Sequence, residues 1–141
     1  MTIHAVSKVK FLEILQTNNI TNDNIEEFKN YFFISINNTG NDIQPPLSAE
    51  KANLKIQFFD DTIWDTKYPD ELKCGEFPVK TMSLEQADDL IKFILRNIGK
   101  ENCIVHCTAG INRSGSVAKF INKITNSDYF EFIRLNPQVQ G

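Results

Sequence analysis

The segment at residues 102–125 constrains the fold more than any other part of the sequence. It opens with the short apolar run NCIVH (102–106), which is typical of a strand buried on both faces. A loop with one glycine, Gly110, follows and leads into RSGSVAKFINKIT. Four apolar residues of that last stretch recur at helical spacing: Val117, Phe120, Ile121 and Ile124. A strand, a short loop and a helix in this order predict one unit of an α/β sheet with parallel strands.

Three further segments have the composition of strands. TIHAVS (2–7) alternates, YFFISI (31–36) is aromatic and β-branched, and NLKIQFF (53–59) alternates again. Helix-like segments separate the strand-like ones, which favours parallel pairing. We therefore expect the α/β class, with a central, mostly parallel sheet of about four or five strands flanked by helices.

Two more helices are predicted with their N-terminal caps. Ser7 is placed to cap KVKFLEILQTN, and Ser83 with Gln86 fits a capping box for SLEQADDLIKFILRN. The first helix has an apolar stripe of Phe11, Leu12, Ile14 and Leu15. The second has an apolar face of Leu84, Ala87, Leu90, Ile91, Ile94 and Leu95. A last helix is expected at 128–136.

Length and composition exclude several function classes. A chain of 141 residues predicts a single domain over 1–141. The net charge of −3 disfavours extended nucleic-acid binding, and no apolar run approaches the length of a membrane span. Three cysteines form no disulfide framework, which favours the cytoplasm. With two histidines and no CxxC pair, we expect no zinc site. We also predict that the protein uses no metal or organic cofactor.

The loop after the 102–106 strand carries the chemistry. Cys107 is followed by five residues and then by Arg113, at the start of the predicted helix. Successive backbone N–H groups over 107–113 can form a nest for an anion, and the positive end of the helix adds to it. Arg113 supplies a planar, two-pronged donor for two phosphate oxygens, while Gly110 permits a backbone conformation that a Cβ would obstruct. Thiols at a helix N-terminus beside a cation ionise readily, so Cys107 is the expected nucleophile.

This pattern, with His106 before the cysteine and Ser114-Gly115 after the arginine, resembles the active-site signature of the cysteine-dependent protein tyrosine and dual-specificity phosphatases. The resemblance implies a protein tyrosine phosphatase-like fold. It also implies an enzyme that hydrolyses phosphate monoesters on phosphorylated proteins through a cysteinyl-phosphate intermediate. The substrate-binding residues would then be Thr108, Ala109, Gly110, Ile111, Asn112 and Arg113.

Ser114 and His106, which flank the loop, are expected to have supporting roles. The hydroxyl of Ser114 can hydrogen-bond the Cys107 sulfur and assist its departure when the intermediate is hydrolysed. By the resemblance, His106 orders the loop through hydrogen bonds to the backbone. It is not expected to act as a general base.

The general acid that protonates the leaving group is expected among four aspartates. By the resemblance, small dual-specificity enzymes place this acid just after the strand equivalent to 54–59, which favours Asp61. Asp70 lies in YPD, which looks like the WPD acid loop of tyrosine phosphatases with tyrosine for tryptophan. Asp65 and Asp60 are the remaining alternatives.

Two other functions compete with protein phosphatase activity. The stretch HCTAGINRSG is also similar to the HCTHGxNRTG loop of RNA 5′-triphosphatases, although Ala109 stands where that group has histidine. Alternatively, a catalytically weak module would use the same nest and Arg113 only to bind phosphate or phosphopeptides.

Overall fold

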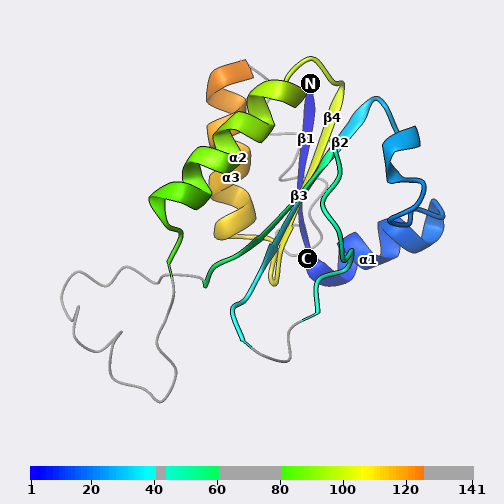
Figure 1. The fold of residues 1–141 in the computed structure, drawn as a ribbon, viewed down its shortest axis with the longest axis horizontal. Coiled ribbons are helices and arrows are strands. Elements are labelled where there is room, and N and C mark those ends of the chain that lie inside the picture. Colours follow the sequence, from blue (N-terminus) through cyan, green and yellow to red (C-terminus); the bar gives the residue numbers. More distant parts are fainter. Residues whose placement is uncertain (41–43, 61–80, 126–141) are drawn as a thin grey trace.

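The computed structural model describes residues 1–40, 44–60 and 81–125. Over these residues, four parallel strands form one sheet in the order β1-β4-β2-β3 (Figure 1). The strands are β1 (Thr2–Ser7), β2 (Tyr31–Asn37), β3 (Leu54–Phe58) and β4 (Asn102–Cys107). The helices are α1 (Lys8–Thr17), a short 3₁₀ turn η1 (Ile25–Glu27), α2 (Leu84–Asn97) and α3 (Arg113–Thr125). The expected α/β class with a parallel sheet is confirmed, and the expected helix at 128–136 lies outside the described residues.

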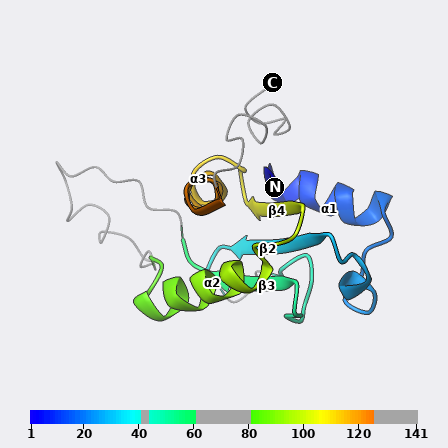
Figure 2. The same ribbon diagram turned by 90° about the horizontal axis from the view of Figure 1, so that it is seen from above.

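Helices cover both faces of the sheet, as the view in Figure 2 shows. Helices α2 and α3 lie on one face, and α1 lies on the other. Strand residues alternate between the two sides, as the period of two requires. In β4, Cys103 and Val105 enter the core under α2 and α3, while Ile104 enters the core under α1. The central strand is therefore buried on both faces, as its composition predicts.

The caps of α1 and α2 form as the sequence predicts. The Ser7 hydroxyl accepts a hydrogen bond from the Lys10 amide at 3.1 Å. Ser83 and Gln86 exchange both bonds of a capping box, at 2.9 and 3.1 Å. Each cap satisfies amides that the helix itself leaves open, and such a cap is worth about 1 kcal/mol.

The predicted apolar faces of the helices are only partly right. Leu12 is about half exposed, and Leu84 and Leu95 also face solvent, while Phe93 is buried and contacts Phe32 edge to face. Leu84 is the first residue of α2, where the helix lies at its most exposed end. Because the sheet covers a narrower strip of α2 than the sequence pattern suggests, residues at the margin of the stripe stay in solvent.

Candidate active site

The carboxyl ends of all four strands contribute to one group of contacts. Ligand sites in parallel sheets commonly form at this edge. The last residue of β1, Ser7, is in register with Cys107, the last residue of β4. Strands β2 and β3 end at Asn37 and Phe58, which are also paired. The segments that follow these four residues therefore emerge side by side.

Cys107 lies at the junction of β4 and the loop, almost completely buried. Its sulfur accepts a hydrogen bond from the Gly110 amide at 3.1 Å and lies 3.2 Å from the Ser114 hydroxyl oxygen. Ser114 is in the first turn of α3, so the sulfur lies against the positive end of that helix. The sulfur therefore lies beside a backbone amide, a hydroxyl and the first turn of a helix.

Gly110 gives the loop its shape. It has a φ of +78°, in the region that favours glycine. A Cβ at this position would lie 2.4 Å from the backbone nitrogen of Ser7 and 2.5 Å from the carbonyl carbon of Val6. The loop thus packs directly on the backbone where β1 becomes α1, and the Lys8 amide also donates to the Thr108 carbonyl at 3.2 Å.

Replacing Gly110 with alanine is therefore expected to damage both stability and the site. The new methyl group would meet backbone atoms that cannot rotate away, and the positive φ adds a cost of about 1–3 kcal/mol. We expect a fall in the free energy of unfolding of at least that size, measured by urea denaturation, together with loss of phosphate binding. Gly99→Ala is the matched control, since a Cβ there meets nothing within 4 Å. Equal stability of the two variants would contradict this account of the loop.

Arg113, the first residue of α3, is 9% exposed. Its Nη1 donates to the Asn38 side-chain oxygen at 2.7 Å and to the Phe59 carbonyl at 2.9 Å, and its Nη2 donates to the Thr108 hydroxyl at 3.2 Å. The guanidinium group therefore contacts Thr108, in the loop that begins at Cys107. Within the described residues, Nε of Arg113 is buried and has no hydrogen-bond partner.

His106 is fully buried on the α1 side of the sheet, with its ring 4.4 Å from that of Phe11. Its Nδ1 lies 3.3 Å from the Cys107 carbonyl oxygen, and its Nε2 lies 2.6 Å from the Ser35 hydroxyl. Because a carbonyl can only accept, Nδ1 carries the proton and Nε2 accepts from Ser35. The ring thus hydrogen-bonds the backbone of Cys107.

Burial lowers the pKa of His106 from 6.5 to about 4, although the hydrogen bond to the Cys107 backbone opposes this shift. The nearby charges of Lys8 and Arg113 lower the pKa further. Since charging a buried imidazole is costly, the neutral ring is the form that the folded protein holds at neutral pH.

This shift predicts a loss of stability in mild acid. The unfolded chain binds the His106 proton near pH 6.5 and the folded chain only near pH 4, so the stabilisation is complete above pH 6.5. It falls as the pH drops through that window, by about 3 kcal/mol in total. Urea denaturation at several pH values should show this slope in the wild type. The slope should flatten in His106→Gln and persist in His4→Gln, and an unchanged slope in His106→Gln would contradict the assignment.

The remaining predicted binding residues form the exposed part of the loop. Thr108, Ala109, Ile111 and Asn112 are exposed, in contrast to the buried Cys107 and Gly110. Their side chains add no charge to the rim of the site.

The predicted general acid, Asp61, lies outside the described residues, as do Asp65 and Asp70. Asp60 is described. Its carboxylate oxygens accept hydrogen bonds from the Thr39 amide at 2.9 Å and the Thr39 hydroxyl at 2.6 Å. Asp60 therefore ties the segment after β3 to the segment after β2.

Sequence reasoning missed three contributors to this site: Asn38, Phe59 and Ser35. All lie in or just after β2 and β3, far from the loop in sequence. The available signal was their position at the carboxyl ends of predicted parallel strands, which meet at one edge of a sheet.

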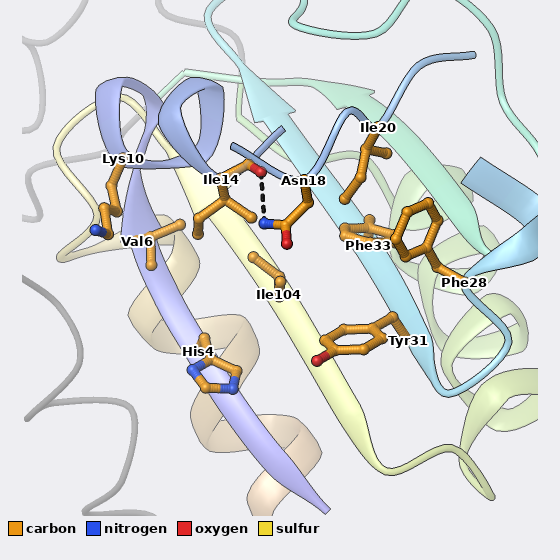
Figure 3. Close-up of a pocket in the computed structure, with 10 residues that line it drawn as sticks. All are labelled: His4, Val6, Lys10, Ile14, Asn18, Ile20, Phe28, Tyr31, Phe33 and Ile104. Atoms are coloured by element: carbon orange, nitrogen blue, oxygen red, sulfur yellow. Dashed lines mark hydrogen bonds between the residues drawn. The ribbon is translucent and has the colours of Figure 1, made fainter. Parts of the chain in front are cut away.

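A separate hollow of about 300 Å³ lies between α1 and the sheet (Figure 3). The residues that line it are His4, Val6, Lys10, Ile14, Asn18, Ile20, Phe28, Tyr31, Phe33 and Ile104. None of the loop residues 107–113 is among them, so this hollow is distinct from the site at Cys107.

The described residues have neither a metal-binding cluster nor a membrane-spanning helix. They contain no group of three or more histidine, cysteine, aspartate or glutamate side chains arranged to hold a metal ion. None of the helices in this part of the chain is long and apolar enough to cross a membrane.

No family model, no curated protein and no solved structure matches the chain.

Proposed function

We propose that the protein is a phosphoric monoester hydrolase of the protein tyrosine and dual-specificity phosphatase type. We also propose that its α/β fold is of the protein tyrosine phosphatase-like kind. The observation that carries the proposal is the position of the Cys107 sulfur. It accepts from the Gly110 amide and lies beside the Ser114 hydroxyl, at the start of the helix that Arg113 opens. A sulfur placed in this way is suited to act as an anionic nucleophile toward phosphorus.

The proposed reaction has two steps. The Cys107 thiolate attacks the phosphorus atom, the bond between phosphorus and the ester oxygen breaks, and an aspartic acid protonates the departing oxygen. Water activated by the same carboxylate then attacks the cysteinyl phosphate and releases inorganic phosphate. The Ser114 hydroxyl, 3.2 Å from the sulfur, can stabilise the thiolate as it leaves. No step requires a metal or an organic cofactor.

The geometry of Arg113 supports binding of a phosphoryl group. Leaving a buried N–H group without a partner costs about 1–3 kcal/mol, and no residue in the described part of the chain pairs with the Nε group of Arg113. An oxygen of a bound phosphate would satisfy it. The same guanidinium would then stabilise the negative charge that the equatorial oxygens carry in the transition state.

The proposed substrate is a phosphorylated protein, and the proposed location of the enzyme is the cytoplasm. The exposed loop residues carry no cationic side chain, whereas a triphosphate end on RNA would need a basic entry path. Hydrolysis of p-nitrophenyl phosphate tests the reaction, and a comparison with triphosphorylated RNA tests the substrate class. Faster turnover of the RNA would replace our proposal with an RNA 5′-triphosphatase, and phosphate binding without turnover would replace it with a binding module.

The proposed general acid, Asp61, gives a second test. We expect Asp61→Asn to lower kcat by about 100-fold and to erase the basic limb of the pH–rate profile, because the leaving group then departs unprotonated. Asp65→Asn and Asp70→Asn are matched controls that should keep this limb. If the limb disappears in one of the controls instead, that aspartate is the acid.

A further inference from the structure

Arg113 donates hydrogen bonds to acceptors in the segments that follow two strands. Asn38 follows β2 and Phe59 follows β3, and both accept from the same nitrogen, Nη1. Both acceptors are neutral, since one is a side-chain amide and the other a backbone carbonyl. Within the described residues, no carboxylate forms an ion pair with Arg113.

One further contact fixes both acceptors at once. Thr39 is the residue after Asn38, and Asp60 is the residue after Phe59. The Asp60 carboxylate accepts from the amide and the hydroxyl of Thr39, at 2.9 and 2.6 Å. The carboxylate of Asp60, next to Phe59 in sequence, therefore binds Thr39 in the segment after β2.

This arrangement has a direct electrostatic consequence. Two neutral acceptors orient the guanidinium without cancelling its charge, whereas a carboxylate at the same place would cancel much of it. Nη1 is occupied on the side of β2 and β3, and Nη2 donates to Thr108, while Nε has no partner among the described residues. Nε and Nη2 form the edge of the guanidinium that can bind two phosphate oxygens side by side.

We propose that Asn38 is a positioning residue that holds Arg113 in the orientation for binding a dianionic phosphate, and that the Thr39–Asp60 pair holds Asn38 in place. This inference rests on the proposed function, because it assigns the edge formed by Nε and Nη2 of Arg113 to the substrate phosphoryl group. Asn38 itself does not contact the substrate.

The experiment measures the dissociation constant of inorganic phosphate by calorimetry, together with the Nε–H resonance of Arg113. The chain has three arginines, so Arg113→Lys assigns this resonance by its disappearance. In the wild type, phosphate should shift the resonance. In Asn38→Ala, we expect roughly tenfold weaker binding and a smaller shift, because the guanidinium is no longer held in one orientation.

Three further variants separate positioning from folding. Asn38→Asp keeps an acceptor but adds a negative charge, so phosphate binding should weaken by roughly tenfold or more while the fold is retained. Thr39→Val removes one hydrogen bond to Asp60 and should weaken binding in the same direction, which keeps the test decisive if Asn38→Ala does not fold. Asn30→Ala, at an exposed asparagine just before β2, is the matched control and should bind phosphate as the wild type does.

The outcomes distinguish this inference from the proposed function. Wild-type affinity in folded Asn38→Ala and Asn38→Asp would overturn the positioning role, even if the protein hydrolyses p-nitrophenyl phosphate. Phosphate binding that depends on Asn38, in a protein without turnover, would support the positioning role and overturn the catalytic proposal. A wild type that binds no phosphate would overturn both.

Discussion

Cys107→Ser should abolish turnover of p-nitrophenyl phosphate, with a loss of at least about 10⁴-fold in kcat. A serine hydroxyl at this position remains protonated at neutral pH, so it is a far weaker nucleophile than a thiolate. The loop amides and Arg113 remain, so the variant should still bind inorganic phosphate. Steady-state kinetics and calorimetry on the same preparation measure the two quantities.

The second buried cysteine of β4 provides the control for this variant. Cys103 lies on the same face of the strand, fully buried among apolar side chains, and burial raises the pKa of its thiol. Cys103→Ala should therefore keep its turnover, at some cost in stability from the smaller side chain. Turnover that survives in Cys107→Ser and disappears in Cys103→Ala would refute the assignment of the nucleophile.

Arg113→Lys should reduce kcat/KM by about 100- to 1,000-fold, although the charge is conserved. A lysine ammonium cannot donate to Asn38 and Phe59 and also present two parallel N–H groups to a phosphate. Because the contacts between Arg113 and the phosphoryl oxygens should strengthen in the transition state, kcat should fall as well as the affinity for substrate.

Arg96→Lys, at an exposed position in the last turn of α2, is the matched control and should leave kcat/KM unchanged. A loss of less than tenfold in Arg113→Lys would mean that the guanidinium has a structural role only, in joining the ends of β2, β3 and β4. Inhibition by inorganic phosphate should weaken in parallel with kcat/KM if the binding role is correct.

The parts of the fold that could be predicted are those set by local patterns. The strand at 102–106, the helix from Arg113 and the caps at Ser7 and Ser83 each depend on residues within a few positions of one another. The phosphate-loop hypothesis is local in the same sense, since it uses only residues 106–115. These features need no knowledge of the tertiary structure.

The contacts that could not be predicted are separated by long stretches of chain. Arg113 is 75 residues from Asn38 and 54 residues from Phe59, and His106 is 71 residues from Ser35. Each pair depends on the strand order β1-β4-β2-β3, which local composition does not specify. The choice of Asp61 stays a prediction for a similar reason, because only the path of the chain after Asp60 determines which carboxylate can reach the leaving-group oxygen of a bound substrate.

The close packing of Gly110 against the backbone of Val6 and Ser7 has a consequence for folding. The loop can adopt its shape only after β1 has paired with β4, because the surface on which it rests does not exist before then. This pairing joins segments from nearly opposite ends of the described chain, and contacts of such high sequence separation form slowly. The proposed phosphate site should therefore form late in folding, after most of the secondary structure is in place.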